Sequence, residues 1–232
     1  MTTTAPRLRP SIRSNAPRTD IERGLWKDGS TVVVGFDEVG KGAWAGPLTV
    51  GAVAIPRDSR IYKIRDSKQL TEREREILFD RIIGWADAAA VGHATPAECD
   101  LLGMSDAQRL ATNRAIAALG TEPDHSLVDG GWDFVERGAT TTIIKGDQRS
   151  LSIAAASIIA KVTRDRMMRS CSDEYPWYAF DSNKGYPCHR HRSALRLLGP
   201  STIHRRSWAF MSGIPWEGIE GCHGNEPALS LF

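Results

Sequence analysis

Short apolar runs alternate with glycine, proline and charged residues along the chain, and this pattern predicts strands. An apolar run over 31–37 predicts a buried strand, and a second run over 48–55 predicts its neighbour. The Gly- and Pro-containing segment 42–47 lies between them, so we expect a hairpin. Two shorter runs predict further strands at 125–128 and 141–145.

Apolar residues three and four positions apart predict helices elsewhere. The predicted helices span 71–90, 105–119, 150–170 and 188–198. Thr71 and Glu74 have the spacing of a capping box, which favours a helix start there, and Gly120 favours a helix end. Hairpin strands followed by alternating helices and strands are typical of an α/β fold, with a mixed sheet covered by helices on both sides.

The composition of the 232-residue chain is typical of one folded domain with tails. A hydrophobic content of 41% is enough to bury a substantial core. Residues 1–28 are rich in Thr, Pro, Arg and Ser without periodicity, so we expect a disordered basic tail in preference to a transit peptide. We expect the domain to cover 29–212 and a second tail to cover 213–232. The apolar stretches all end before ~18 residues, so we expect no membrane association.

The four cysteines lack C-x-x-C pairing, which favours a reducing compartment and a cytoplasmic protein. Cys188, His189 and His191 could suggest zinc. Because no second Cys/His pair has a matching spacing, we expect these three to be free surface side chains.

Positive charge is concentrated near the C-terminal end, although the net charge is only +2. The segment 184–206 contains six Lys or Arg residues and no acid. Such a concentration suits a phosphate backbone, whereas the alternative is a solvated helix face.

Two adjacent acids, Asp37 and Glu38, end the first predicted strand and precede Gly40-Lys41-Gly42. Carboxylate oxygens are ligands of Mg²⁺ and Mn²⁺, and glycines let backbone N–H groups approach a ligand closely. The pattern therefore favours a metal beside a phosphate. A surface turn with incidental acids is the alternative that this segment leaves open.

The same segment has the G-x-x-x-x-G-K spacing of a nucleotide-binding P-loop, from Gly35 to Lys41. Gly42 stands where that loop requires Ser or Thr, and Asp37 and Glu38 would place two negative charges among phosphates. We therefore regard a P-loop as remote.

Two further acids follow predicted strands. Asp129 precedes Gly130, so it could belong to a hairpin turn, and Asp147 could cap the next helix. Yet strand ends and helix starts are the edges at which sites assemble in α/β sheets. Four converging acids could hold two divalent ions about 4 Å apart.

The ordered set of motifs resembles the bacterial ribonuclease HII family. The seven matching motifs are 35–42 together with 45–47, then 66–71, 127–130, 145–147, 150–165, 181–186 and 204–207. Each motif alone is weak, but seven in order over about 31–210 make chance agreement implausible.

The resemblance implies an RNase H-like mixed β-sheet flanked by helices, with a helical C-terminal extension. It implies hydrolysis of the RNA strand of RNA–DNA hybrids and incision on the 5′ side of single ribonucleotides in duplex DNA, leaving 3′-hydroxyl and 5′-phosphate ends. Asp37, Glu38, Asp129 and Asp147 match the catalytic acids that bind two ions, Mg²⁺ or Mn²⁺, with Asp37 as the expected bridging ligand.

The resemblance also assigns substrate contacts. Gly40, Lys41 and Gly42 match a loop that reads the ribose 2′-hydroxyl, although Lys41 replaces the usual Arg and so loses its bidentate fork. Tyr186 matches the tyrosine that packs on the sugar after the ribonucleotide. The candidate phosphate anchors, for which plain surface charge is an equal alternative, are Lys68, Lys161, Arg164, Lys184 and Arg205.

Three classes of function therefore compete: a nuclease, a catalytically silent nucleic-acid-binding module of the same fold, and a P-loop nucleotide switch. A pure binder would gain from losing negative charge near phosphates, so the four intact acids favour the nuclease. We expect it to act as a monomer on RNA–DNA hybrids and ribonucleotide-containing duplex DNA.

Overall fold

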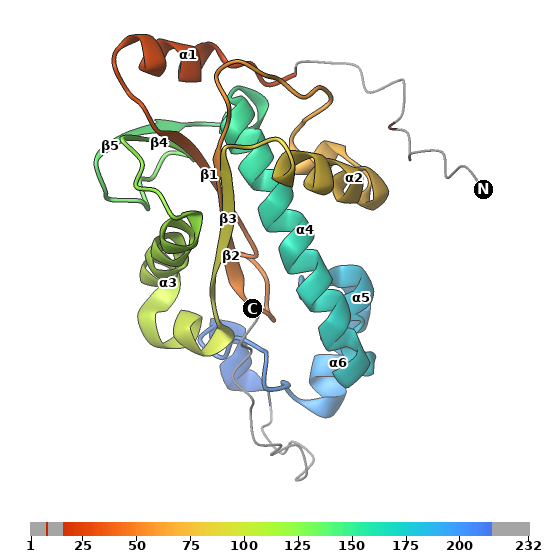
Figure 1. Cartoon of the computed structure of the whole chain (residues 1–232). Helices are drawn as coiled ribbons and strands as arrows, with labels where there is room; N and C mark the ends of the chain where they lie inside the picture. The colour runs from red at the N-terminus through yellow and green to blue at the C-terminus, as the bar shows by residue number, and fades with distance from the viewer. Residues whose placement is uncertain (1–7, 9–15, 215–232) are drawn as a thin grey trace, which may run out of the picture.

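A five-stranded mixed sheet forms the centre of the computed structural model, which describes Leu8 and residues 16–214 (Figure 1). The strands are β1 (Val33–Val39), β2 (Leu48–Ala54), β3 (Ala88–Ala94), β4 (His125–Asp129) and β5 (Ala139–Ile143). Their order is β3-β2-β1-β4-β5, in which β1–β2 and β2–β3 are antiparallel and β1–β4 and β4–β5 are parallel. The predicted hairpin and mixed sheet are confirmed.

Helices cover both faces of this sheet. They are α1 (Asp20–Lys27), α2 (Glu72–Ile83), α3 (Pro96–Leu119), α4 (Leu151–Glu174), α5 (Phe180–Asn183) and α6 (His189–Leu198), and short 3₁₀ turns lie at η1 (Ser67–Gln69), η2 (Gly146–Gln148), η3 (Pro176–Tyr178) and η4 (Ala209–Gly213). Figure 1 shows α3 on one face of the sheet and α4 on the other, with α5 and α6 beside the far end of α4. None of the helices in the described part of the chain has the length and apolarity needed to span a bilayer.

Small residues let α4 pack closely against the two central strands. A Cβ on Gly35 would overlap the backbone of Ser152, and one on Gly51 would overlap the carbonyl of Ala156. Residues 151–160 of α4 are all buried, and Ser150 caps the helix by accepting a hydrogen bond from the Ile153 N–H. The close approach fixes α4 against β1, which positions the site described below.

The helix caps in the structure agree with several of the predicted helix boundaries. Thr71 and Glu74 form the expected capping box at the start of α2, and Thr95 and Glu98 form a second one at the start of α3. Gly120 ends α3 in the left-handed conformation, as predicted. Gly103 has a non-helical backbone and divides α3 in two, so the helix predicted over 105–119 matches the second part, whereas the first part, which begins at Pro96, was not predicted.

The helix predicted over 71–90 is too long. It ends at Ile83, and the alanine-rich segment Ala88–Ala94 is instead the edge strand β3. Alanine favours helices, but here a small side chain is needed because α3 packs directly on this strand. A Cβ on Gly92 would overlap the backbone of Ala111 and Ala115. Packing has therefore overridden local preference.

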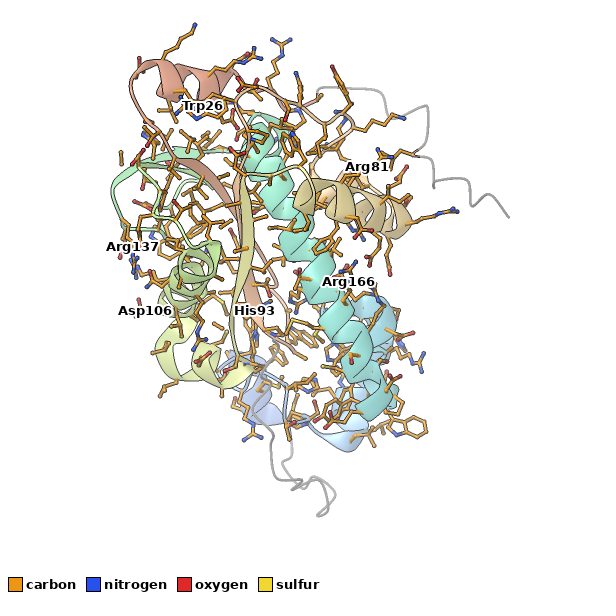
Figure 2. All side chains as sticks on the ribbon, in the orientation of Figure 1. Trp26, Arg81, His93, Asp106, Arg137 and Arg166 are labelled. Carbon is orange, nitrogen blue, oxygen red and sulfur yellow. The ribbon has the colours of Figure 1, made fainter. Side chains whose placement is uncertain are left out.

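The prediction of a disordered tail is wrong for the part of residues 1–28 that the structure describes from residue 16 onward. Helix α1 packs at one end of the sheet, where Ile21, Leu25 and Trp26 contact an apolar cluster, and its Glu22 is fully buried. The Glu22 carboxylate accepts hydrogen bonds from the Ser150 hydroxyl at 2.7 Å and from the Ser152 N–H at 3.0 Å. Figure 2 shows Trp26 beneath α1, where it packs on the core. Residues 1–7 and 9–15, and most of the predicted tail 213–232, lie outside the described residues.

Candidate active site

Three acids from separate segments converge beside the sheet. Asp37 lies on β1, Asp129 ends the adjacent parallel strand β4, and Asp147 lies in η2 just before α4. One carboxylate oxygen from each lies within 4.8 Å of the others. The predicted convergence of these three residues is present in the structure, and hard oxygen donors at this spacing suit Mg²⁺ or Mn²⁺.

Local backbone geometry holds Asp129 and Asp147 together. The Gly146 N–H donates to Asp129 Oδ1 at 2.6 Å, which ties the end of β4 to η2. A Cβ on Gly146 would lie only 2.6 Å from the Ile153 side chain and 3.3 Å from Asp129 Oδ1. Lys145 enters the turn with a positive φ of 55°. The absence of a side chain at Gly146 therefore favours this close approach.

Glu38 lies next to this group without being part of it. Its side chain is partly buried, and the three acids that lie within 4.8 Å of one another do not include it. Burial raises the pKa of Glu38, Lys41 opposes that rise, and the charge of Asp129 adds to it. The structure thus places Glu38 at the edge of the centre.

The acids carry more negative charge than their surroundings compensate. Burial, followed by the charges of Glu38 and Asp129, raises the pKa of Asp37 well above its usual value, against a hydrogen bond from Ser157. Burial, followed by Asp66 and Asp129, raises the pKa of Asp147 to about 6. Such shifts are expected where carboxylates share a pocket and a cation would relieve their repulsion.

Asp66 and Lys68 border the acids on the η1 side, and only Lys68 was predicted as a site residue. Asp66 Oδ1 accepts from the Lys68 N–H at 2.9 Å, and Gln148 donates to Asp66 Oδ2 at 3.4 Å. Burial opposes the charge of Lys68, but the charges of Asp66, Asp147, Asp37 and Asp129 outweigh it and raise its pKa. Lys68 is exposed, so it can contact a phosphate beside the acids.

The loop from Gly40 to Gly42 is hydrogen-bonded to Tyr186. The Gly40 N–H donates to the Tyr186 hydroxyl at 3.0 Å. Gly40 has a φ of 89°, and a Cβ there would overlap the Arg164 guanidinium. Gly42 and Lys41 are exposed, and the Lys41 ammonium lies 5.2 Å from the Trp132 ring centroid.

Three of the five predicted phosphate anchors are buried, so the expected phosphate contact is wrong for them in this structure. Arg164 is fully buried and donates to the carbonyls of Pro47, Lys184 and Ala45 at 2.8, 2.8 and 3.0 Å. Arg205 is also fully buried.

Arg205 and Lys184 likewise bind the protein's own backbone. Arg205 donates to the carbonyls of Gly46 and Lys41, and Lys184 donates to the carbonyl of Asp181. Lys161 remains partly accessible, although its ammonium lies 2.7 Å from Asp165. Arg164, Arg205 and Lys184 therefore bind backbone carbonyls within 41–47 and 181–184.

A buried pair of histidines, His191 and His204, contacts the backbone of Tyr186. Ser201 N–H donates to His204 Nδ1, the two Nε2 atoms of His204 and His191 lie 2.9 Å apart, and His191 Nδ1 lies 2.9 Å from the Tyr186 carbonyl oxygen. Because His204 Nδ1 accepts, its Nε2–H donates to His191, whose Nδ1–H then donates to Tyr186. Burial, followed by His191, lowers the pKa of His204 to about 3, so both rings fit the neutral state.

Tyr186, Gly40, Arg164, Arg205, His191 and His204 together are called the recognition cluster below. The histidines could not be assigned from the sequence, because their pairing joins α6 to a later loop. The expectation of a free surface His191 is wrong, since its ring is buried against His204. Cys188 instead caps α6, and its Sγ accepts from the His191 N–H at 3.4 Å.

The P-loop alternative fails on geometry as well as on sequence. Gly35 lies inside β1 and is paired with Val53 and Leu127, so it cannot begin a phosphate-binding loop. The surface-turn alternative also fails for Asp37, which is 7% exposed and lies among other acids.

The model of the Ribonuclease HII family matches residues 34–211. The chain belongs to the Ribonuclease HII family. Ribonuclease HII of Streptomyces avermitilis is 43% identical over 207 residues, which cover 88% of this chain and 89% of that protein. Ribonuclease HII of a Synechococcus species is 45% identical over 197 residues, which cover 83% of this chain and 88% of that protein.

Solved structures agree with this family. Ribonuclease H2 from Pyrococcus horikoshii matches with a TM-score of 0.65 and 30% identity, covering 79% of this chain and 96% of that one. RNase HII from Archaeoglobus fulgidus, solved in a complex with PCNA, matches with a TM-score of 0.65 and 27% identity, covering 77% and 95%. Bst-RNase HIII in complex with Mn²⁺ matches with a TM-score of 0.53 and 25% identity, covering 64% and 56%.

Family membership confirms the predicted RNase H-like fold and the enzyme class. The chain is a type II ribonuclease H, an endonuclease that acts on RNA–DNA hybrids. Nucleases of this fold use divalent metal ions, which agrees with the convergent acids of the Ribonuclease HII site.

Proposed function

We propose that this ribonuclease HII incises duplex DNA on the 5′ side of a single embedded ribonucleotide, in addition to cutting the RNA strand of hybrids, and leaves 3′-hydroxyl and 5′-phosphate ends. The convergence of Asp37, Asp129 and Asp147 within 4.8 Å carries the chemical part of this proposal. It acts as a monomer and uses Mg²⁺ or Mn²⁺.

Asp37, Asp129 and Asp147 would hold two divalent ions, and Glu38 would complete the set from the edge of the centre. When bound, such ions make hydroxide available from water near neutral pH and stabilise the leaving 3′-oxygen. The donor set fits, because all the ligands are carboxylate oxygens whose raised pKa values report uncompensated negative charge.

The protein's own residues position the substrate. Lys68 stands beside the acids and would contact a phosphate next to the scissile bond. The loop from Gly40 to Gly42 would meet the ribose 2′-hydroxyl through its backbone. The Tyr186 ring would pack on the following sugar, where a deoxyribose offers an apolar surface and a ribose would bury a hydroxyl.

The geometry also argues against a silent binding module. A protein that only binds nucleic acid would be weakened by buried carboxylates near phosphates. Here two buried carboxylates and one partly buried carboxylate are brought together from β1, η2 and β4.

The test is an end-chemistry assay with three duplexes: all-DNA, DNA with one ribonucleotide, and an RNA–DNA hybrid. With Mg²⁺ or Mn²⁺ we expect cleavage of the second and third duplexes only, with 3′-hydroxyl and 5′-phosphate products, and no cleavage in EDTA. Cleavage of the hybrid alone would reject the junction specificity. Binding without cleavage at either metal would establish the silent module.

A further inference from the structure

A second basic surface lies beyond the acids, on the side opposite Tyr186. It is a hollow of about 850 Å³ between the N-terminal segment, the loop after β2 and the turn that leads into α4. Its charged lining residues are Arg18, Arg23, Arg60, Arg149 and Asp20. Four arginines against one acid give the hollow a clear excess of positive charge.

Backbone pairing fixes the walls of this hollow. The Arg18 N–H donates to the Arg149 carbonyl at 3.1 Å, and the Leu151 N–H donates to the Arg18 carbonyl at 3.0 Å. Arg60 Nη2 donates to the Pro17 carbonyl at 3.1 Å. The N-terminal segment is thus held alongside the turn that carries Asp147, and the arginines are placed by structure as well as by composition.

The charges of the hollow are weakly neutralised. Arg18 and Asp20 approach to 3.7 Å, but their side chains are 78% and 68% exposed, so this pair contributes little. Arg23 and Arg149 are both exposed. Exposed guanidinium groups in a concave site are well suited to phosphate oxygens.

The hollow and the acids share a wall. Gln148 lines the hollow, follows Asp147 directly and hydrogen-bonds Asp66 beside the acids. Positions along α4 give the spacing between these regions. Ser150, which precedes the helix, lies at the hollow, and Ser157 lies at Asp37. Arg164 lies at Gly40 and Tyr186. At 1.5 Å per residue, the hollow and the recognition cluster lie about 10 Å to either side of the acids.

We propose that this hollow binds backbone phosphates of the duplex on the 5′ side of the scissile bond. The inference rests on the proposed function, in which Tyr186 meets the sugar on the 3′ side and the acids meet the scissile phosphate. A strand that continues past the acids reaches the hollow after about three base pairs, since phosphates of one strand are ~3.4 Å apart along the axis. Arg149 lies within the family match, whereas Arg18 and Arg23 belong to a segment that precedes it, since the match begins at residue 34.

The test measures binding in EDTA, so that no cleavage occurs, by fluorescence anisotropy at several NaCl concentrations. Two duplexes with one ribonucleotide are compared, one with about twelve and one with about two base pairs on its 5′ side. In the double variant Arg23→Gln/Arg149→Gln we expect affinity for the long duplex to fall about tenfold or more at low salt, and its salt slope to fall by about 2. Affinity for the short duplex should change little.

The matched control is Arg81→Gln, an exposed arginine on α2 that Figure 2 labels. It removes the same type of charge away from the hollow and should leave both affinities and the salt slope unchanged. Equal affinities of wild type and double variant for the long duplex would overturn the proposal, as would an equal loss on both duplexes. Cleavage by the wild type in Mg²⁺, measured separately, reports on the proposed function, so failure of one claim does not mask the other.

Discussion

The acidic centre, formed by Asp37, Asp129 and Asp147, differs from the recognition cluster in how its charged groups are compensated. In the acidic centre, Asp37 and Asp147 lie among other carboxylates, and their pKa values are raised. In the recognition cluster, the buried Arg164 donates to three carbonyl oxygens and the histidines are neutral. The carboxylates that would bind an external cation are left uncompensated, whereas the buried Arg164 is hydrogen-bonded to backbone carbonyls of the protein itself.

This difference has a consequence for stability. Uncompensated carboxylates oppose folding until a cation binds, so the acidic centre costs stability in the absence of divalent ions. A buried arginine that satisfies three carbonyls is costly to remove, because both its own bonds and those acceptors are lost. Substitutions in the two regions should therefore separate activity from stability.

The largest effect is expected for Asp129→Asn, which removes a ligand charge with little change in volume. Cleavage should fall by roughly three orders of magnitude or more, since a divalent ion supplies several kcal/mol of transition-state stabilisation. The melting temperature in EDTA should stay equal or rise, because repulsion at Asp37 is relieved. Turnover near the wild-type rate would show that Asp129 is not a metal ligand and is only part of a turn.

A large effect on stability is expected for Arg164→Met in the recognition cluster. The carbonyls of Pro47, Ala45 and Lys184 would lose their donor, and we expect the free energy of unfolding to fall by about 3 kcal/mol or more. The control is Arg166→Met on the same helix, an exposed residue paired with Glu76 and labelled in Figure 2. It should cost less than about 1 kcal/mol. Urea unfolding in EDTA compares the two, and equal losses would show that the burial of Arg164 is energetically unimportant.

A smaller and more selective effect is expected at Tyr186. Tyr186→Ala should reduce kcat/KM on the single-ribonucleotide duplex. The corresponding loss of transition-state stabilisation should be about 1–3 kcal/mol, by analogy with aromatic stacking on bases. Tyr186→Phe keeps the ring and removes only the acceptor for the Gly40 N–H, so it should cost about 0.5–1.5 kcal/mol. If the alanine variant cuts this duplex as well as the wild type does, Tyr186 is a packing residue.

The smallest effect is a pH dependence of stability from His204. Burial lowers its pKa from 6.5 to about 3, so the unfolded state binds more protons between these values. The stability it contributes is present above pH 6.5 and is lost as pH falls toward 3. As pH falls from 6.5 to 5, the free energy of unfolding of His204→Gln should fall less steeply than that of the wild type. The two slopes should differ by up to ~1 kcal/mol per pH unit.

The acids respond in the opposite direction, because a raised pKa in the folded state gains stability as pH falls through it. Their contribution is common to wild type and His204→Gln, so it cancels in the difference between the two. Urea unfolding in EDTA at several pH values gives that difference. Parallel pH profiles would mean that His204 is already able to take up a proton in the folded protein.

The sequence by itself determined the parts of this protein that depend on neighbouring residues. The apolar run of β1, the capping box at Thr71, the cap at Ser150 and the end of α3 at Gly120 were predictable, because each rests on contacts within a few positions. The acids at strand ends were predictable for the same reason, since position on a strand fixes the edge at which a side chain emerges.

Only the tertiary structure decided what depends on distant partners. Ala88–Ala94 became a strand because α3 packs on it, and Glu22 anchors α1 because Ser150 and Ser152 donate to one oxygen of its carboxylate. Arg164 has the same charge as an exposed arginine, and its role as an internal brace follows from three carbonyls that no local pattern encodes. A buried polar group must find partners, and the fold alone determines which residues these are.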